Sequence, residues 1–382
     1  MKNPHEPSLW CMSGQDKLSD VCALSSTDPG PDPNMPDHGA VTAADRIRAT
    51  LHSGAVGDAL GYRCSWEQGT KSSSSPLAIS DDTQMSLYVM DGLLEVMEWA
   101  AEGSAADPPA TVWLAMLRWY RSQRGDFPED TPRPLLRWID ADDQPLGHER
   151  HPDPVCLSGL EHTEMRLINR VANPDAVTGT AVSRATGYAM LPDIDHRLRV
   201  SLVRQSVVLT HGSTTAWVSA AVFALILTEL LAGSDLDRAV HQALEYLRQE
   251  NSAEEQLSAV LAQISRYTEQ PTLSPGRDAD HPQRVPADRV LACALGMVAT
   301  NPSGSLGVLA DQLFDCLGQT PHEDLSTLGS IAGQLLGARD GTLPHHRRGD
   351  LEPALVAGQV AVLDEMATRW LKFTEPLLGA TG

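Results

Sequence analysis

The chain has 382 residues, of which 42% are hydrophobic, so it is long and apolar enough for a globular protein with a sizeable core. Lysine and arginine total 29 against 50 aspartates and glutamates, which gives a formal charge of −21. This charge repels phosphate backbones and anionic membrane surfaces, so nucleic acid and membrane are poor candidates for partners. It is compatible with a site that holds divalent cations.

Residues 1–42 are rich in Pro, Ser, Asp and Gly, and we expect them to form a flexible N-terminal arm. Trp10 and a few apolar neighbours could dock on the main domain or on a protein partner, as in an antitoxin or immunity protein. The start shows no basic stretch followed by an apolar one, so we expect no secretory signal and a cytoplasmic location. The six scattered cysteines form no C-x-x-C pair and indicate neither a zinc site nor a disulfide framework.

From residue 43 to residue 382 the pattern is helical, with no convincing alternation of the kind that marks a strand, and it predicts a single all-α domain. The most apolar stretch, 216–232, contains Glu229 and lacks basic flanks, so we expect a buried helix there instead of a membrane span. Residues 123–160 are rich in Pro and Asp and predict a long loop over a surface or a site. The predicted helices cover about 43–61, 82–102, 109–122, 181–190, 194–210, 214–232, 236–250, 254–267, 287–299, 304–317, 327–338 and 352–373.

Two adjacent carboxylates, Asp81 and Asp82, follow Ser80 at the start of the predicted helix 82–102. An Asp in a first helical turn stabilises the helix, because it accepts hydrogen bonds from free N–H groups and complements the helix dipole. Carboxylates and hydroxyls at a helix start are also the oxygen ligands that hard cations prefer. The run alone therefore leaves capping and metal binding about equally open.

Small or polar residues also gather at Gly54 to Gly61, Gly179 to Ser183, Leu209 to Ser213 and Glu323 to Thr327. The first segment is a glycine-rich helix that permits close approach by its neighbours. The second is a loop entering a helix, whose backbone N–H groups could bind an anion. The third breaks two helices at a His-Gly pair, and the fourth places acidic and hydroxyl groups before another small-residue helix. Each is a weak signal alone.

Taken together, these segments resemble the ADP-ribosylglycohydrolase family, which includes the dinitrogenase reductase-activating glycohydrolases and the ADP-ribosylarginine hydrolases. The family pattern G-A-x-G-D-A-L-G stands at Gly54 to Gly61, and Ser/Thr-Asp-Asp-Thr-Gln-Met stands at Ser80 to Met85. The likeness runs from about Asp45 to Gly341. It implies a compact orthogonal bundle of helices and a hydrolase that cleaves an ADP-ribosyl, or related ribosyl, N- or O-glycosidic bond on a protein side chain or a small molecule.

The resemblance further implies one or two Mg²⁺ or Mn²⁺ ions at the bottom of a cleft that holds ADP-ribose or an ADP-ribosylated substrate. The ions would orient the ribose and lower the pKa of a water that attacks the anomeric carbon. One half of the metal site would come from the Ser-Asp-Asp run and the other from a late Asp-x-Asp-Thr/Ser run. The implied ligands are Ser80, Asp81, Asp82, Asp324, Ser326 and Thr327.

The substrate contacts that the resemblance implies lie in the middle of the chain. Backbone N–H groups around Gly179, Thr180 and Ser183 would hold the diphosphate, and His211 would lie near the same ligand. The catalytic residues would be Asp81 and Asp82, together with an acid or base.

Two positions depart from the family pattern. Aligned on the helix that follows, Asp324 takes the first Asp position of the late run and Ser326 the second, so one carboxylate ligand is missing. A one-residue insertion would instead place Asp324 on the second position, with His322 or Glu323 nearby.

The other departure concerns the acid or base. The Glu that many bacterial members carry after the glycine-rich helix is Ser65 here, and Glu67 lies two residues further on as the candidate replacement. These departures keep a second hypothesis open, a pseudoenzyme that binds ADP-ribose or a partner protein without turnover.

Overall fold

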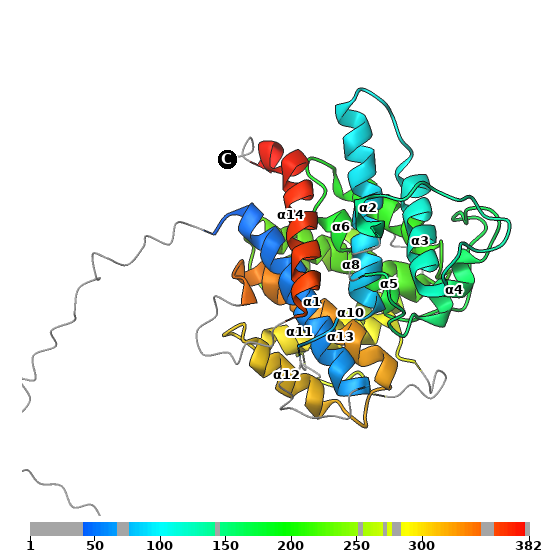
Figure 1. Ribbon diagram of the computed structural model, residues 1–382. Coiled ribbons are helices and arrows are strands. Elements are labelled where there is room, and N and C mark those ends of the chain that lie inside the picture. The colour runs from blue at the N-terminus through cyan, green and yellow to red at the C-terminus, as the bar shows by residue number, and fades with distance from the viewer. Residues whose placement is uncertain are drawn as a thin grey trace, which may run out of the picture. The chain divides into compact units, whose positions relative to one another are not determined.

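The computed structural model describes residues 41–66, 76–141, 146–250, 255–269, 273–276, 284–344 and 355–378. Within these ranges the chain is all-α, with a few isolated β-bridges and no strand, which confirms the predicted fold class (Figure 1). A 3-10 turn, η1, covers Trp138–Asp140. The helices are α1 (Ala43–Trp66), α2 (Asp81–Ala101), α3 (Pro108–Arg124), α4 (Pro154–Leu160), α5 (Thr180–Ser183), α6 (Thr186–Ala189), α7 (His196–Val207), α8 (Thr214–Leu231), α9 (Leu236–Glu250), α10 (Glu255–Glu269), α11 (Ala287–Ala299), α12 (Leu306–Asp315), α13 (His322–Asp340) and α14 (Ala357–Leu378).

Several predicted elements differ from the observed ones. The helix predicted over 43–61 continues to Trp66, and the one predicted over 352–373 covers Ala357–Leu378. The single helix expected over 181–190 is divided into the short helices α5 and α6. Helix α13 begins at His322 instead of residue 327, because Leu325 continues its apolar face and is fully buried. The loop expected over 123–160 contains η1 and α4. Helix α4 begins there because Pro154 suits a first turn and Asp153 Oδ1 accepts a hydrogen bond from Val155 N at 2.9 Å.

Helices α1 and α13 lie against each other (Figure 1). Glycines at their contact leave almost no side chain between them. A Cβ atom added to Gly57 of α1 would lie 2.1 Å from the carbonyl oxygen of Gly329 of α13. One turn further on, a Cβ on Gly61 would lie 2.0 Å from the oxygen of Leu325. Only glycine permits backbones to approach this closely. The glycine-rich helix therefore brings the first turns of α13 against the C-terminal half of α1.

Helix α8 is the most apolar element and lies inside the bundle. Its length and composition would allow it to cross a membrane, but 78% of it is buried against the rest of the protein. It contacts α5, α6, α7, α9, α10 and α11. Ser213 begins α8 by accepting a hydrogen bond from Ala216 N at 3.1 Å. The buried helix expected from the sequence thus forms the centre against which the shorter helices pack.

We expect Gly57→Ala to lower the free energy of unfolding by about 1–3 kcal/mol, because its Cβ would force α1 and α13 apart. Urea unfolding followed by circular dichroism measures this. Gly358→Ala, at an exposed helical position of α14, is the matched control and should leave stability unchanged or raise it by up to about 1 kcal/mol. Equal stability of Gly57→Ala and the wild type would contradict the close packing.

Candidate active site

Asp58 of α1 holds the first turn of α2. Its Oδ1 accepts a hydrogen bond from Ser80 Oγ at 2.5 Å, and its Oδ2 accepts from Ser80 N at 2.9 Å and from Thr83 Oγ1 at 2.5 Å. Ser80 is the N-cap and accepts from Asp82 N at 3.2 Å. Burial, and then the charge of Asp82, raises the pKa of Asp58 to about 7. Since Ser80 and Asp58 cap the helix, the carboxylates of Asp81 and Asp82 are available for other contacts.

The carboxylates of Asp81 and Asp82 make different contacts. Asp82 accepts from Ser183 Oγ at 2.6 Å and from Thr327 Oγ1 at 2.9 Å, so it links α2 to α5 and α13. Asp81 Oδ2 accepts from Asp153 N at 2.9 Å. Burial raises the pKa of both groups, and the charge of Asp82 raises that of Asp81 further. The fully buried pair is therefore an electrostatically crowded site that a cation would stabilise.

A pocket of about 210 Å³ opens beside Asp81. Trp66 and His151 stand on its wall with their rings stacked, 4.0 Å between centroids and 5° between planes. Two arginines, Arg124 and Arg284, also line it, and they pair with Glu149 and Asp153 of the same lining. The remaining lining residues are Pro152, Pro154, Leu157 and Thr180.

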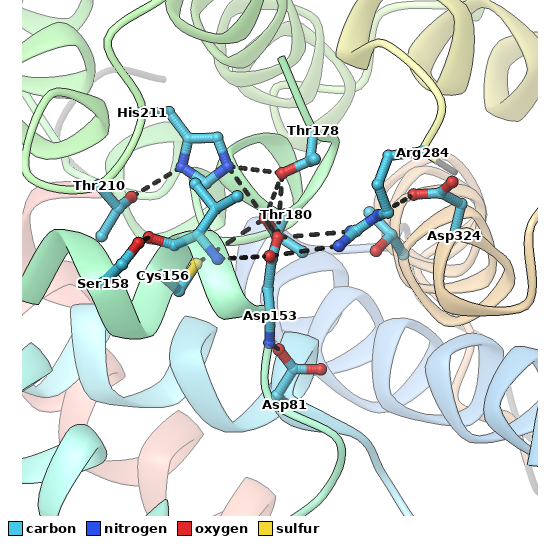
Figure 2. Close-up of polar contacts among 12 residues, drawn as sticks. Asp81, Asp153, Cys156, Ser158, Thr178, Thr180, Thr210, His211, Arg284 and Asp324 are labelled. Atoms are coloured by element: carbon cyan, nitrogen blue, oxygen red, sulfur yellow. Dashed lines mark hydrogen bonds and ion pairs between the residues drawn. The ribbon is translucent and has the colours of Figure 1, made fainter. Parts of the chain in front are cut away.

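Asp153 is the centre of a buried polar network behind this pocket (Figure 2). Its Oδ2 accepts from Thr180 Oγ1 at 2.7 Å and from Thr178 Oγ1 at 3.0 Å. His211 Nε2 lies 2.6 Å from Thr178 Oγ1, and its Nδ1 lies 2.8 Å from Thr210 Oγ1. Burial lowers the pKa of His211 to about 3, so its imidazole is neutral at physiological pH.

Arg284 joins Asp153 to Asp324 (Figure 2). Its Nη1 lies 3.2 Å from Asp153 Oδ1, and its Nε donates to Asp324 Oδ1 at 3.1 Å. Although burial opposes it, the charge of Arg284 holds the pKa of Asp153 below its ordinary value. Asp324 also accepts from Val285 N at 2.8 Å. Burial raises the pKa of Asp324 to about 6, against the lowering effect of Arg284.

The residues expected to bind substrate are divided between the pocket and the interior. Thr180 lines the pocket, whereas Gly179, Ser183 and His211 are buried. The backbone N–H groups of Val182 and Ser183 donate to Gly179 O, at 2.8 and 3.4 Å, and are therefore used within the short helix. His211 does not line the pocket and is connected to it only by its polar contacts with Thr178 and Thr180.

Ser65, which stands at the family's Glu position, has a structural role. Ser65 Oγ donates to Gly61 O at 2.9 Å and to His322 O at 2.5 Å, so it ties the end of α1 to the start of α13. Glu67 lies outside the described residues, as do residues 1–40 of the N-terminal arm predicted over 1–42.

Comparison with known proteins identifies the family. The sequence model of the family described as ADP-ribosylglycohydrolase matches residues 40–376. This chain belongs to that family. A solved structure titled "ADP-ribosylglycohydrolase-related protein complex" is similar in fold, with a TM-score of 0.53 and 20% sequence identity. The match covers 87% of this chain and 98% of the other. None of the curated proteins searched matches the sequence.

The ADP-ribosylglycohydrolases are hydrolases, and two groups of residues in this member could hold a metal ion. In the described ranges, the ligand atoms of Asp153, Cys156 and His211 lie within 4.8 Å of one another. Burial, and then Asp153, raises the pKa of the Cys156 thiol to about 12, so it is protonated, and Arg184 Nη1 donates to its sulfur at 3.6 Å. With a second arginine on Asp153, this group forms a hydrogen-bonded network that suits a hard cation poorly.

The other group is the oxygen-only set at the start of α2. Ser80 and the two carboxylates that follow supply hydroxyl and carboxylate oxygens, the donors that Mg²⁺ and Mn²⁺ prefer. Asp81 lines the pocket, so an ion on this side would be within reach of a ligand. The late run fits an ion less well, because Arg284 already pairs with Asp324, and Ser326 is neutral. Thr327 instead donates to Asp82.

Asp153 and Arg284 are among the residues that line the site and were not predicted from the sequence. Asp153 could have been noticed, because Asp followed by Pro is typical of a helix start. Arg284 had no local signal, since the carboxylate of Asp153 that it pairs with stands 131 residues away.

We expect the imidazole of His211 to stay neutral from pH 8 down to about pH 4, because burial lowers its pKa to about 3. Nitrogen-15 NMR of the histidine rings measures this, and the signal lost in His211→Gln identifies the residue. The unfolded chain takes up this proton near pH 6.5, so the contribution of His211 to stability is present above that pH and is lost as the pH falls toward 3. A midpoint near 6.5 in the folded protein would contradict the prediction.

Proposed function

We propose that this protein hydrolyses an ADP-ribosyl, or related ribosyl, N- or O-glycosidic bond with the help of a divalent cation. The observation that carries the proposal is the pocket in which the carboxylate of Asp81 and the guanidinium groups of Arg124 and Arg284 lie together. Positive side chains suit the diphosphate of ADP-ribose, and a carboxylate beside them suits a cation. Membership in the ADP-ribosylglycohydrolase family supports the same conclusion.

Ser80, Asp81 and Asp82 would hold a Mg²⁺ or Mn²⁺ ion. The raised pKa values of Asp81 and Asp82 mean that their ionised forms are costly without a positive charge nearby. A bound cation stabilises those forms and supplies a water of lowered pKa. The chain itself contributes rigidity, because Asp58 holds Ser80, and Ser183 and Thr327 hold Asp82. The ligand oxygens are thus oriented before any ion arrives.

The residue that takes the proton from the attacking water would be Glu67 or Asp81. Glu67 directly follows Trp66, which lines the pocket. Asp81 lines the pocket itself, so a water bound there would be within its reach. The two candidates differ in one respect, since only Asp81 would also bind the cation.

We expect Asp81→Asn to lose both cation binding and hydrolysis, because the amide cannot replace an anionic ligand. Glu67→Gln should lower kcat by about 10²-fold or more while cation binding is kept, if Glu67 is the general base. The assay measures ADP-ribose released from ADP-ribosylated arginine, serine or nucleotide substrates with Mg²⁺ or Mn²⁺, and calorimetry measures the ion. Asp175→Asn, an exposed carboxylate outside this pocket, is the control that should leave both unchanged.

No release of ADP-ribose with either ion, beside an active glycohydrolase as reference, would overturn hydrolysis. The second candidate function is then binding without turnover, which the neutral Ser326 and the structural use of Ser65 favour. Calorimetry with ADP-ribose separates the two, because a pseudoenzyme would bind the ligand and leave it intact.

A further inference from the structure

The guanidinium group of Arg284 stands between two carboxylates from distant parts of the chain. Its Nε donates to Asp324 Oδ1 at 3.1 Å, while Nη1 and Nη2 lie 3.2 and 3.4 Å from the two oxygens of Asp153 (Figure 2). The Arg284 side chain is 15% exposed, and the two carboxylates are 1% and 0% exposed. This is a buried bridge, in which the arginine contacts both anions through separate edges of its planar group.

We propose that Arg284 is a built-in cation that takes the place of a metal ion on the Asp324 side of the site. The proposed function includes one divalent cation on the Asp81 side. The inference rests on that function only for the expected total number of ions and does not require hydrolysis. The protein would then hold one exchangeable divalent cation beside one fixed guanidinium.

The contacts of Asp324 support this assignment. One of its oxygens accepts from Arg284 Nε and the other from Val285 N, so Asp324, unlike Asp82, is already paired with a positive charge. The next oxygen-bearing side chain of the late run is the buried, neutral hydroxyl of Ser326, and Thr327 donates a hydrogen bond to Asp82. A divalent cation on Asp324 would lie beside the positive charge of Arg284 with a single anionic ligand. Two positive charges close together in a buried site repel each other strongly.

The charge of the whole cluster supports it as well. Four carboxylates of the site, those of Asp81, Asp82, Asp153 and Asp324, are buried, and two of them, Asp81 and Asp153, line the pocket. Arg284 contacts two of them, Asp153 and Asp324, whereas the nearby Arg184 donates to Thr210 at 2.7 Å. Removing a buried cation from paired carboxylates leaves uncompensated charge, which other cations can then neutralise.

The test counts Mn²⁺ ions bound to the full-length, metal-depleted protein by equilibrium dialysis with electron paramagnetic resonance of the free ion. We expect one ion for the wild type and one for Ser326→Asp, because the guanidinium still occupies the second position. The double variant Arg284→Ala/Ser326→Asp should bind one more ion than Ser326→Asp alone. Arg124→Ala is the matched control, since it removes the other pocket arginine, whose ion pair with Glu149 is exposed, and should leave the count unchanged.

Two ions in the wild type, or an unchanged count in a folded double variant, would overturn the proposal. Circular dichroism shows whether each variant is folded. If the double variant does not fold, Arg284→Lys/Ser326→Asp replaces it: a retained positive charge should keep the count of Ser326→Asp, and a gained ion would overturn the role of that charge. A wild type without any ion, but a double variant that gains one, would support Arg284 as the substitute cation while contradicting the proposed function.

Discussion

The contact between the backbones of α1 and α13 is the constraint on which the site depends. Glycines at Gly57, Gly61 and Gly329 let the two helices approach until a single methyl group would collide with a carbonyl oxygen. From this shared surface α1 presents Asp58 to the start of α2, and α13 presents Thr327 to Asp82. Three helix segments that are distant in sequence therefore converge on one pair of carboxylates. A side chain in the interface would separate the groups that define the site.

This arrangement concentrates negative charge inside the protein, and the cost is visible in the raised pKa values of Asp58, Asp81 and Asp82. Hydroxyl and backbone N–H donors satisfy the oxygens as hydrogen-bond acceptors but do not neutralise them. A purely structural core would replace such groups by apolar ones at little loss. The carboxylate cluster is therefore better explained by cation binding than by a contribution to the stability of the fold.

Much of this fold could be predicted from the sequence because its helices carry their own signals. Ser80 is a typical N-cap, Ser213 is another, and the apolar spacing behind them marks two buried helices. The pair Asp81 and Asp82 could be found for the same reason, since it lies at a recognisable helix start. The start of α13 was placed five residues too late, because Leu325 alone extends its apolar face toward Pro321.

The rest of the site depends on contacts that no local pattern encodes. Asp153 lies in a stretch rich in Pro and Asp that looks like loop, and its partners Thr178, Thr180 and Arg284 come from two other parts of the chain. His211 is prominent in the sequence because it stands at a helix break. In the fold it is buried behind Thr178 and Thr180, which its ring contacts. Long-range packing determines which polar residues meet, so periodicity and caps cannot supply it.

The two sides of the site then differ in how their charge is balanced. On the Asp81 side the carboxylate of Asp81 lines an open pocket, through which an ion would reach it. On the Asp324 side the balancing charge is covalently part of the chain and remains in place when free cations are removed. A guanidinium carries one charge where a metal ion carries two, and it offers hydrogen-bond donors where the ion offers open coordination positions. Arg284 can therefore hold an anion and fix Asp153, but it cannot activate a water, so any water chemistry must depend on the Asp81 side alone.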